Sequence, residues 1–129
     1  MSSEPRWLNK AALVLLHNES LALFGGPSGL RDEGLLDSAL VRPVNLLLYR
    51  PDADLASLAA AYAYGLAQNH PFIDGNKRAA FLAIGLFLHI NGQRLRASPV
   101  EAIQTIFALA SGQLSEIELA DWIRAHQAP

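Results

Sequence analysis

Apolar residues recur along this chain at the spacing of helices, and stretches that alternate like strands are nearly absent. The pattern predicts a first helix over residues 7–24, which ends where glycine and proline crowd segment 25–29. A short helix is predicted over 33–41, and it ends before Pro43 because the residue preceding a proline avoids helical geometry. A further short helical piece is predicted over 44–49.

Two later segments, 54–69 and 76–90, are apolar on nearly every side. Helices of this kind lie in the middle of a domain, so these two are predicted to be its buried centre. Asp54 is a good N-cap for the first of them. Gly85 within the second predicts close approach of a neighbouring helix; the alternative is a tolerated glycine that costs about 1 kcal/mol relative to alanine.

Helix-start signals occur twice near the C-terminal end. Ser98, Pro99 and Glu101 supply an N-cap, a proline at the first helical position and a glutamate three residues after the cap. Ser115 and Glu118 repeat this capping box. Together the signals predict an all-α fold, a compact single-domain bundle of about six helices that spans the whole chain.

The composition fits one globular domain and removes several classes of function. The chain has 129 residues, of which 51% are apolar and 17% are charged. Ten lysines and arginines against twelve acidic residues leave a net charge of −2, so no direct nucleic-acid binding is expected. The absence of cysteine excludes disulfides, thiolate metal sites and cysteine nucleophiles.

No segment has the character of a membrane span. The apolar runs are interrupted before they reach the roughly 18–20 residues that a span requires. The first residues, MSSEPRW, lack the basic and apolar pattern of a secretion signal. We therefore expect a cytoplasmic protein that has no membrane partner.

The segment NHPFIDGNKRAAF, residues 69–81, places two cations where a helix begins. Lys77 and Arg78 lie in the first turn, where the helix dipole disfavours positive charge. A bound anion would remove the conflict, because the unpaired amides of a first helical turn bind phosphate. A phosphate between Gly75 and Arg78 would satisfy these amides and neutralise both cations.

Two neighbouring side chains add the groups that phosphate chemistry needs. Asp74 could hold a magnesium ion that also contacts the phosphates. His70 could take the proton from an attacking hydroxyl, because histidine exchanges protons near neutral pH. In the alternative interpretation Asp74 is only an N-cap, His70 is only a turn residue, and the cations point into water. The residues alone leave both interpretations open.

The same segment resembles the signature of the Fic/Doc family, H-x-F-x-[D/E]-x-N-x-R. Every fixed position is present, as His70, Phe72, Asp74, Asn76 and Arg78. The upstream stretch GGPSGLRDEGLLDSALVRP is similar to the segment before the core in the Doc (death-on-curing) branch. The resemblance covers most of the chain and agrees with a compact helical fold.

The resemblance implies a role for each residue of the motif. In this family the histidine is the base, the acidic residue holds magnesium, and the turn that follows grips the phosphates of ATP. The catalytic residue would then be His70 and the metal ligand Asp74. The nucleotide- and phosphate-binding residues would be Gly75, Asn76, Lys77 and Arg78.

Lys77 distinguishes two chemistries within the family. Members that transfer AMP to a protein hydroxyl usually read G-N-G-R, and here Lys77 replaces the second glycine, where a side chain would crowd the phosphates. Doc-type toxins have N-K-R, and the resemblance implies that they bind ATP the other way round and transfer its γ-phosphoryl group. They are implied to be protein kinases that modify an elongation factor and so stop translation. A small antitoxin holds them silent by inserting a helix into the active-site groove.

We therefore expect the toxin of a toxin–antitoxin pair, an ATP-dependent kinase of a protein Ser or Thr hydroxyl with a translation factor as its target. No match to the family's internal inhibitory helix occurs in the chain, so a separate antitoxin is the expected inhibitor. Three other functions stay open. They are AMP transfer, a non-enzymatic binding module, and nucleic-acid cleavage, which the acidic balance disfavours.

Residues outside the motif receive weaker predictions. The resemblance implies that loop 25–34 is a flap that docks the target, with a flexible linker as the alternative. Arg31 and Asp32 within it either bind phosphate or pair with each other. A packed or surface role is predicted for His17 and a structural role for His89.

Overall fold

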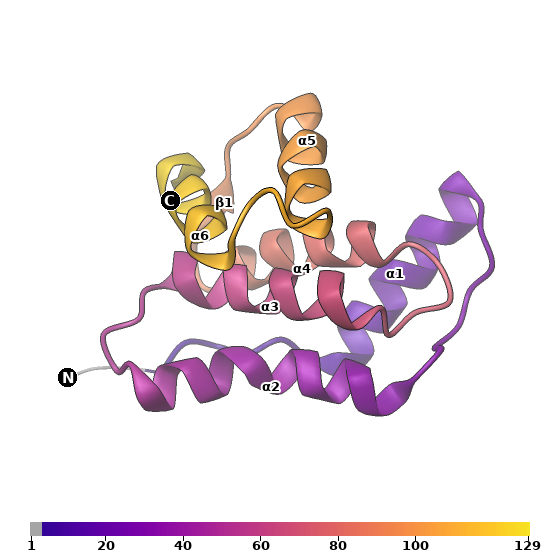
Figure 1. Cartoon of the computed structure of the whole chain (residues 1–129), viewed down its shortest axis with the longest axis horizontal. Coiled ribbons are helices and arrows are strands. Elements are labelled where there is room, and N and C mark those ends of the chain that lie inside the picture. Colours follow the sequence, from indigo (N-terminus) through magenta and orange to yellow (C-terminus); the bar gives the residue numbers. More distant parts are fainter. Residues whose placement is uncertain (1–3) are drawn as a thin grey trace.

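The computed structural model describes residues 4–129, so the predicted domain extends beyond it only at residues 1–3. Within this range the chain forms six helices and one short antiparallel strand pair (Figure 1). The prediction of an all-α bundle of about six helices is confirmed. The helices are α1 (Lys10–Phe24), α2 (Glu33–Tyr49), α3 (Leu55–Asn69), α4 (Asn76–Ile90), α5 (Pro99–Ala110) and α6 (Glu116–His126), and the strands are β1 (Arg94–Leu95) and β2 (Gln127–Ala128).

Helix α3 forms the centre of the bundle. It contacts α2 along one side and α4, α5 and α6 on the others, while α1 crosses the end of the bundle against α4 (Figure 1). Ten of its fifteen residues are buried, and six of the ten are alanines. Small side chains let several helices approach one axis closely, so the alanine-rich sequence accounts for this central position. The prediction that 54–69 and 76–90 are the buried helices is confirmed.

Helix α2 is longer than the sequence predicts. The two short pieces expected over 33–41 and 44–49 form one continuous helix, with Pro43 inside it and buried. A proline within a helix removes one backbone donor and costs about 3 kcal/mol. The contact along the length of α3 offsets this cost, so tertiary packing overrides the local stop signal.

The close helix contact predicted at Gly85 occurs at Gly65 instead. A Cβ atom on Gly85 would meet nothing within 4 Å, so the alternative of a tolerated glycine holds there. A Cβ atom on Gly65 would lie 3.1 Å from both Cα and Cβ of Ala39. Helices α2 and α3 therefore cross with their backbones in near contact at Ala39 and Gly65.

These two glycines predict opposite effects of the same substitution. Gly65→Ala is expected to lower the free energy of unfolding by about 1–3 kcal/mol, because the added methyl group pushes α2 away. Gly85→Ala is expected to raise it by about 0.5–1 kcal/mol through helix propensity alone. Urea denaturation of both variants checks the pair. Equal effects at the two positions would contradict the assigned crossing point.

The first helix starts three residues later than predicted. Asn9 is its N-cap and accepts a hydrogen bond from the backbone N–H of Ala12 at 3.0 Å. The preceding residues run across the core instead of continuing the helix. Trp7 stacks on Phe87 with ring centroids 6.2 Å apart, and the Leu8 N–H donates to the Tyr62 hydroxyl at 3.0 Å.

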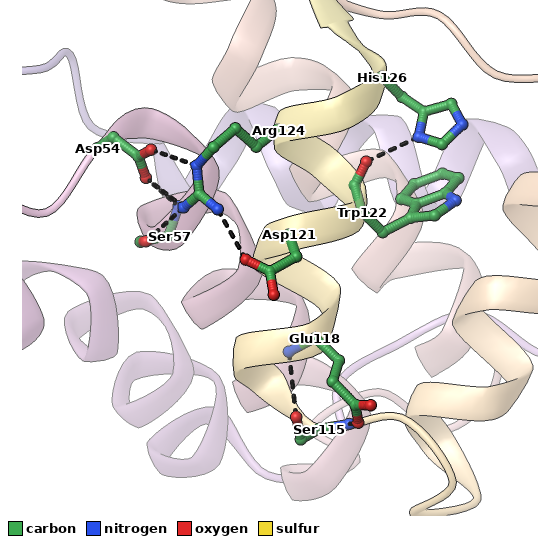
Figure 2. A network of polar contacts seen from close by, with 8 residues as sticks. All are labelled: Asp54, Ser57, Ser115, Glu118, Asp121, Trp122, Arg124 and His126. Atoms are coloured by element: carbon green, nitrogen blue, oxygen red, sulfur yellow. Dashed lines mark hydrogen bonds and ion pairs between the residues drawn. The ribbon is translucent and has the colours of Figure 1, made fainter.

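Polar contacts fasten helix α6 to the start of α3 (Figure 2). The Arg124 guanidinium donates to both carboxylate oxygens of Asp54, at 2.7 and 3.1 Å, and to Asp121 at 2.8 Å. Asp54 also caps α3, as predicted, by accepting from the Ser57 N–H at 2.9 Å. The hydrogen bonds from Arg124 are the main reason that the pKa of Asp54 falls to about 2.

The two predicted capping boxes differ in outcome. Ser115 and Glu118 form both reciprocal bonds, whereas Ser98 accepts from the Glu101 N–H without a return bond. The Glu101 carboxylate instead contacts the His126 imidazole at 3.2 Å. The second half of that box is replaced by a contact between α5 and α6.

The lowered pKa of Asp54 predicts a pH-dependent contribution to stability. A carboxylate with a folded pKa near 2 and an unfolded pKa of 3.8 stabilises the fold above about pH 4 and loses that effect as the pH falls to 2. Both partners are more than a third exposed, so we expect about 1 kcal/mol after solvent screening. Urea denaturation of Asp54→Asn, which keeps a capping side chain, should show this deficit at pH 7 and lose it near pH 2. A deficit independent of pH would contradict the assignment.

Candidate functional site

His70 ends α3 in an unusual backbone conformation. Its φ of 52° and ψ of 54° are left-handed, and within residues 4–129 no other residue except glycine has a positive φ. The helix predicted over 54–69 ends here, because His70 precedes Pro71 and such a residue avoids right-handed helical geometry. Non-glycine residues in this region are strained and concentrate at functional sites.

Arg31 holds the backbone of this strained turn. Its Nε donates to the carbonyl of His70 at 2.7 Å and its Nη2 donates to the carbonyl of Asn69 at 2.9 Å. Among the described residues Arg31 forms no ion pair with Asp32, so that alternative is wrong, whereas phosphate binding by Arg31 stays a prediction. Asp32 instead caps α2, where it accepts from the Leu35 N–H at 3.0 Å.

The end of loop 25–34 pairs, as a short extended segment, with the motif loop, which is residues 70–75 between α3 and α4. Leu30 and Phe72 form an antiparallel bridge. The Arg31 N–H donates to the Pro71 carbonyl at 2.7 Å, and the Ile73 N–H donates to the Gly29 carbonyl at 3.0 Å. These bonds exclude a free linker at this end of the loop. Whether the loop docks a target stays a prediction.

The start of α4 lacks a capping side chain. Gly75 is the N-cap, with φ 75°, and no side chain of the described residues accepts from the first turn. Asp74 does not cap the helix, contrary to the alternative interpretation, because its Oδ1 accepts from the Gly75 N–H at 2.8 Å. Asn76 turns back and forms two bonds with the backbone of Phe72, at 2.9 and 3.0 Å. The first-turn amides of α4 are left to an external acceptor.

The two cations of this turn rest on aromatic rings. Lys77 Nζ lies 5.1 Å from the centroid of the Phe107 ring, and Arg78 Cζ lies 4.9 Å from that of Phe24. Neither cation forms an ion pair with a carboxylate in residues 4–129. Both aromatic rings are more than half exposed, so these contacts are weak. Within residues 4–129, therefore, no side chain supplies a counter-ion for the positive helix end and its two cations.

Helix α1 supplies a floor beneath this turn. His17 is fully buried, and its ring centroid lies 3.9 Å from that of Phe72. A Cβ atom on Gly75 would lie 2.8 Å from His17 Cε1 and 3.3 Å from Leu21 Cδ2. Burial is the main cause that lowers the pKa of His17, and the nearby Arg78 charge lowers it further, so the ring is neutral at pH 7. The packed role expected for His17 is confirmed, but its place under the motif was not foreseen.

Gly26 also shapes the site, and the sequence analysis did not identify it. A Cβ atom there would lie 2.6 Å from Asp74 Oδ2, and its φ of 115° also favours glycine. Only glycine lets the chain pass this close to the Asp74 carboxylate. The pair of glycines at 25–26 was a signal for a turn, but nothing local indicated its partner.

The donor set around Asp74 fits a magnesium ion only in company with a substrate. In the described part of the chain no three His, Cys, Asp or Glu side chains gather as a metal site. Asp74 is exposed, and its Oδ2 makes no hydrogen bond within that part. One free carboxylate oxygen beside an anion site is the arrangement magnesium accepts when phosphate oxygens and water complete its shell.

His70 completes the site as the group that can move a proton. Its side chain is exposed, and among residues 4–129 no hydrogen bond engages its ring. The short motif loop joins it to Asp74 and the open start of α4. The site thus combines an accessible imidazole, one carboxylate, unpaired amides and two cations.

Comparison with known proteins supports the family resemblance that the motif indicates. A sequence model of the Fic/DOC family matches residues 7–88, which include the whole site except Phe107. The chain is similar to the protein kinase doc of Escherichia phage P1, with 33% identity over 119 residues, which cover 92% of this chain and 94% of that protein. It is also similar to the Toxin Doc of Mycolicibacterium smegmatis, with 50% identity over 76 residues, which cover 57% of this chain and 58% of that protein. No helix within residues 4–129 is long and apolar enough to cross a membrane.

Proposed function

This chain belongs to the Fic/DOC family, and we propose that it is the toxin of a toxin–antitoxin pair that phosphorylates a Ser or Thr hydroxyl of a protein. The observation that carries the proposal is the uncapped start of α4, with Lys77 and Arg78 lacking carboxylate partners beside His70. The names of the two similar proteins, a protein kinase and a toxin, agree with it.

The start of α4 is proposed to bind the phosphates of ATP. Backbone N–H groups of the first turn, including those of Asn76 and Lys77, would donate to phosphate oxygens. Arg78 offers paired donors that suit a phosphate, whereas Lys77 adds a point charge. An anion there would replace weak cation–π contacts with charge-assisted hydrogen bonds, so its binding would relieve the electrostatic conflict in this turn.

His70 is proposed to be the general base. One of its ring nitrogens takes the proton of the Ser or Thr hydroxyl as the hydroxyl oxygen forms a bond with the γ-phosphorus. The bond between the γ-phosphorus and the oxygen that bridges to the β-phosphate breaks, and ADP leaves with that oxygen. The Arg31 bonds to the backbone at His70 would keep the imidazole in position during transfer.

Asp74 is the residue that would hold magnesium. When bound, the ion would neutralise charge on the phosphates and fix their orientation. Gly26 supports this role because it leaves room for the Asp74 carboxylate. The hydrogen bond from Gly75 to Oδ1 fixes one oxygen and leaves the other to coordinate.

Lys77 favours transfer of the γ-phosphoryl group over transfer of AMP. Its side chain extends from the first turn toward Phe107 and occupies the position that is glycine in the AMP-transferring pattern. The bulk and charge there suit a nucleotide whose terminal phosphates, not its α-phosphate, lie against the turn.

The target is proposed to be a translation elongation factor.

A surface beside the site suits the proposed antitoxin. Val100, Ile103 and Phe107 follow one another along one side of α5 and are each more than half exposed. Phe107 lies under Lys77, so this apolar stripe reaches the phosphate site. An amphipathic helix that covered the stripe could also block access to His70.

The proposed activity can be tested with ATP labelled separately at the α- and γ-phosphates. Purified protein is incubated with each label and a cell lysate, with His70→Ala as the control. We expect labelled protein only with γ-labelled ATP and only with the unaltered chain. If label arrives only from the α-phosphate, AMP transfer would replace phosphoryl transfer as the proposed reaction. Absence of both labels, with growth arrest unaffected by His70→Ala, would favour a binding module.

A further inference from the structure

His17 has a buried imidazole that no hydrogen bond satisfies. Its relative exposure is 0%, and neither Nδ1 nor Nε2 has a hydrogen-bond partner among the described residues. An unsatisfied buried polar group costs about 1–3 kcal/mol. A leucine at this position would fill the space without that cost, as Leu21 does one turn further along α1. Packing alone therefore does not account for a histidine here.

The ring faces the turn that is proposed to bind phosphate. Its Cε1 lies nearest to Gly75, and a Cβ atom on that residue would also lie 3.6 Å from Nε2. Asp74 precedes Gly75 in the same turn, and no hydrogen bond joins His17 to either residue in the described part of the chain. A polar nitrogen thus lies within a small movement of the backbone that carries the metal-binding carboxylate.

We propose that His17 is a positioning residue: when phosphate occupies the start of α4, its buried imidazole donates an N–H to the main chain of the Asp74–Gly75 turn. The inference rests on the proposed function and deepens it. A neutral imidazole has one N–H to donate, and a backbone carbonyl can accept it. The bond would hold the Asp74 carboxylate and the first-turn amides in one arrangement.

The physical advantage is rigidity of the turn in the bound state. Reacting groups must be held in place to within a fraction of an ångström. This requires support from residues packed behind those that touch the substrate. Leu21 supports the turn only through packing, which leaves sliding of the loop possible. A directed hydrogen bond from His17 would remove that freedom once the anion draws the amides inward. Bonds of this kind are often long in a free site and tighten on ligand binding.

The test compares His17→Leu with His17→Gln. Leucine keeps the packing volume and loses both nitrogens, whereas glutamine keeps an N–H donor of similar reach. Stability is measured by urea denaturation and affinity for ATP with magnesium by calorimetry. We expect His17→Leu to be at least as stable as the unaltered chain yet to bind ATP about tenfold more weakly. Glutamine should restore most of that affinity.

The outcomes separate this inference from the proposed function. If the unaltered chain binds ATP and His17→Leu binds it equally well, the positioning role is wrong while the phosphate site stands. If the unaltered chain does not bind ATP, both are wrong. If His17→Leu does not fold, ¹⁵N NMR of the unaltered chain decides. Movement of the His17 ring nitrogen signals on addition of ATP with magnesium supports the hydrogen bond, and unchanged signals overturn it.

Discussion

Replacement of His70 by alanine is expected to lower phosphoryl transfer to protein by about 10²–10⁴-fold, the usual effect of losing a general base. The ring makes no hydrogen bond within residues 4–129, so its removal leaves the packing of the bundle intact. The backbone bonds from Arg31 to this turn do not involve the side chain. ATP binding should therefore persist while transfer is lost, which labelled-ATP assays and calorimetry measure separately.

Two controls make this result specific. His70→Asn also lacks the base, but asparagine tolerates the left-handed backbone, so it separates loss of the base from added strain. His89→Ala removes an exposed histidine near the far end of α4 and should leave transfer unchanged. If His70→Asn kept the full rate, the role of base would pass to another group. Expression of the unaltered chain should arrest growth, and either His70 variant should relieve the arrest.

Gly75→Ala is expected to reduce transfer by about 10²-fold. The residue has a φ of 75°, and its new Cβ would lie 2.8 Å from a fully buried ring, which cannot move aside as a surface side chain would. The turn itself must shift, and misplacement by about 1 Å costs a factor of this size. Unlike the His70 variants, this one should weaken ATP binding as well as transfer.

Gly92 offers a matched control for this substitution. Its φ of 79° is nearly the same, but a Cβ atom there would meet nothing within 4 Å. Gly92→Ala therefore shares the backbone strain without the clash under the proposed phosphate site. Equal losses of ATP affinity in the two variants would mean that strain, not the contact with His17, determines the effect.

The helices were predictable wherever the signal was local. Asp54 and Ser115 begin their helices as the capping rules require. The predictions failed where packing between distant segments decided the outcome. Pro43 remains inside α2 because the helix lies along α3, and the close backbone contact involves Gly65, whose partner Ala39 belongs to another helix.

The residues of the candidate site also divide into those that the local sequence indicates and those that only the fold brings close. The motif residues from His70 to Arg78 are neighbours in the sequence, so one loop brings them together. The residues that pack beneath them are distant in the sequence, because His17 comes from α1 and Gly26 from the loop that follows it. Arg31 was noticed for its charge, but its backbone partners at 69–70 depend on the bridge between two loops. Such partnerships follow from the fold, and no periodicity within either segment indicates them.

The proposed function requires the start of α4 to bind the phosphates of ATP. A crystal structure with a slowly hydrolysed ATP analogue and magnesium would show whether it does. We expect terminal phosphates on the first-turn amides, Arg78 turned from Phe24 onto a phosphate oxygen, and the metal at Asp74. A nucleotide bound elsewhere, with Arg78 still on Phe24 and the first-turn amides in contact only with water, would contradict it.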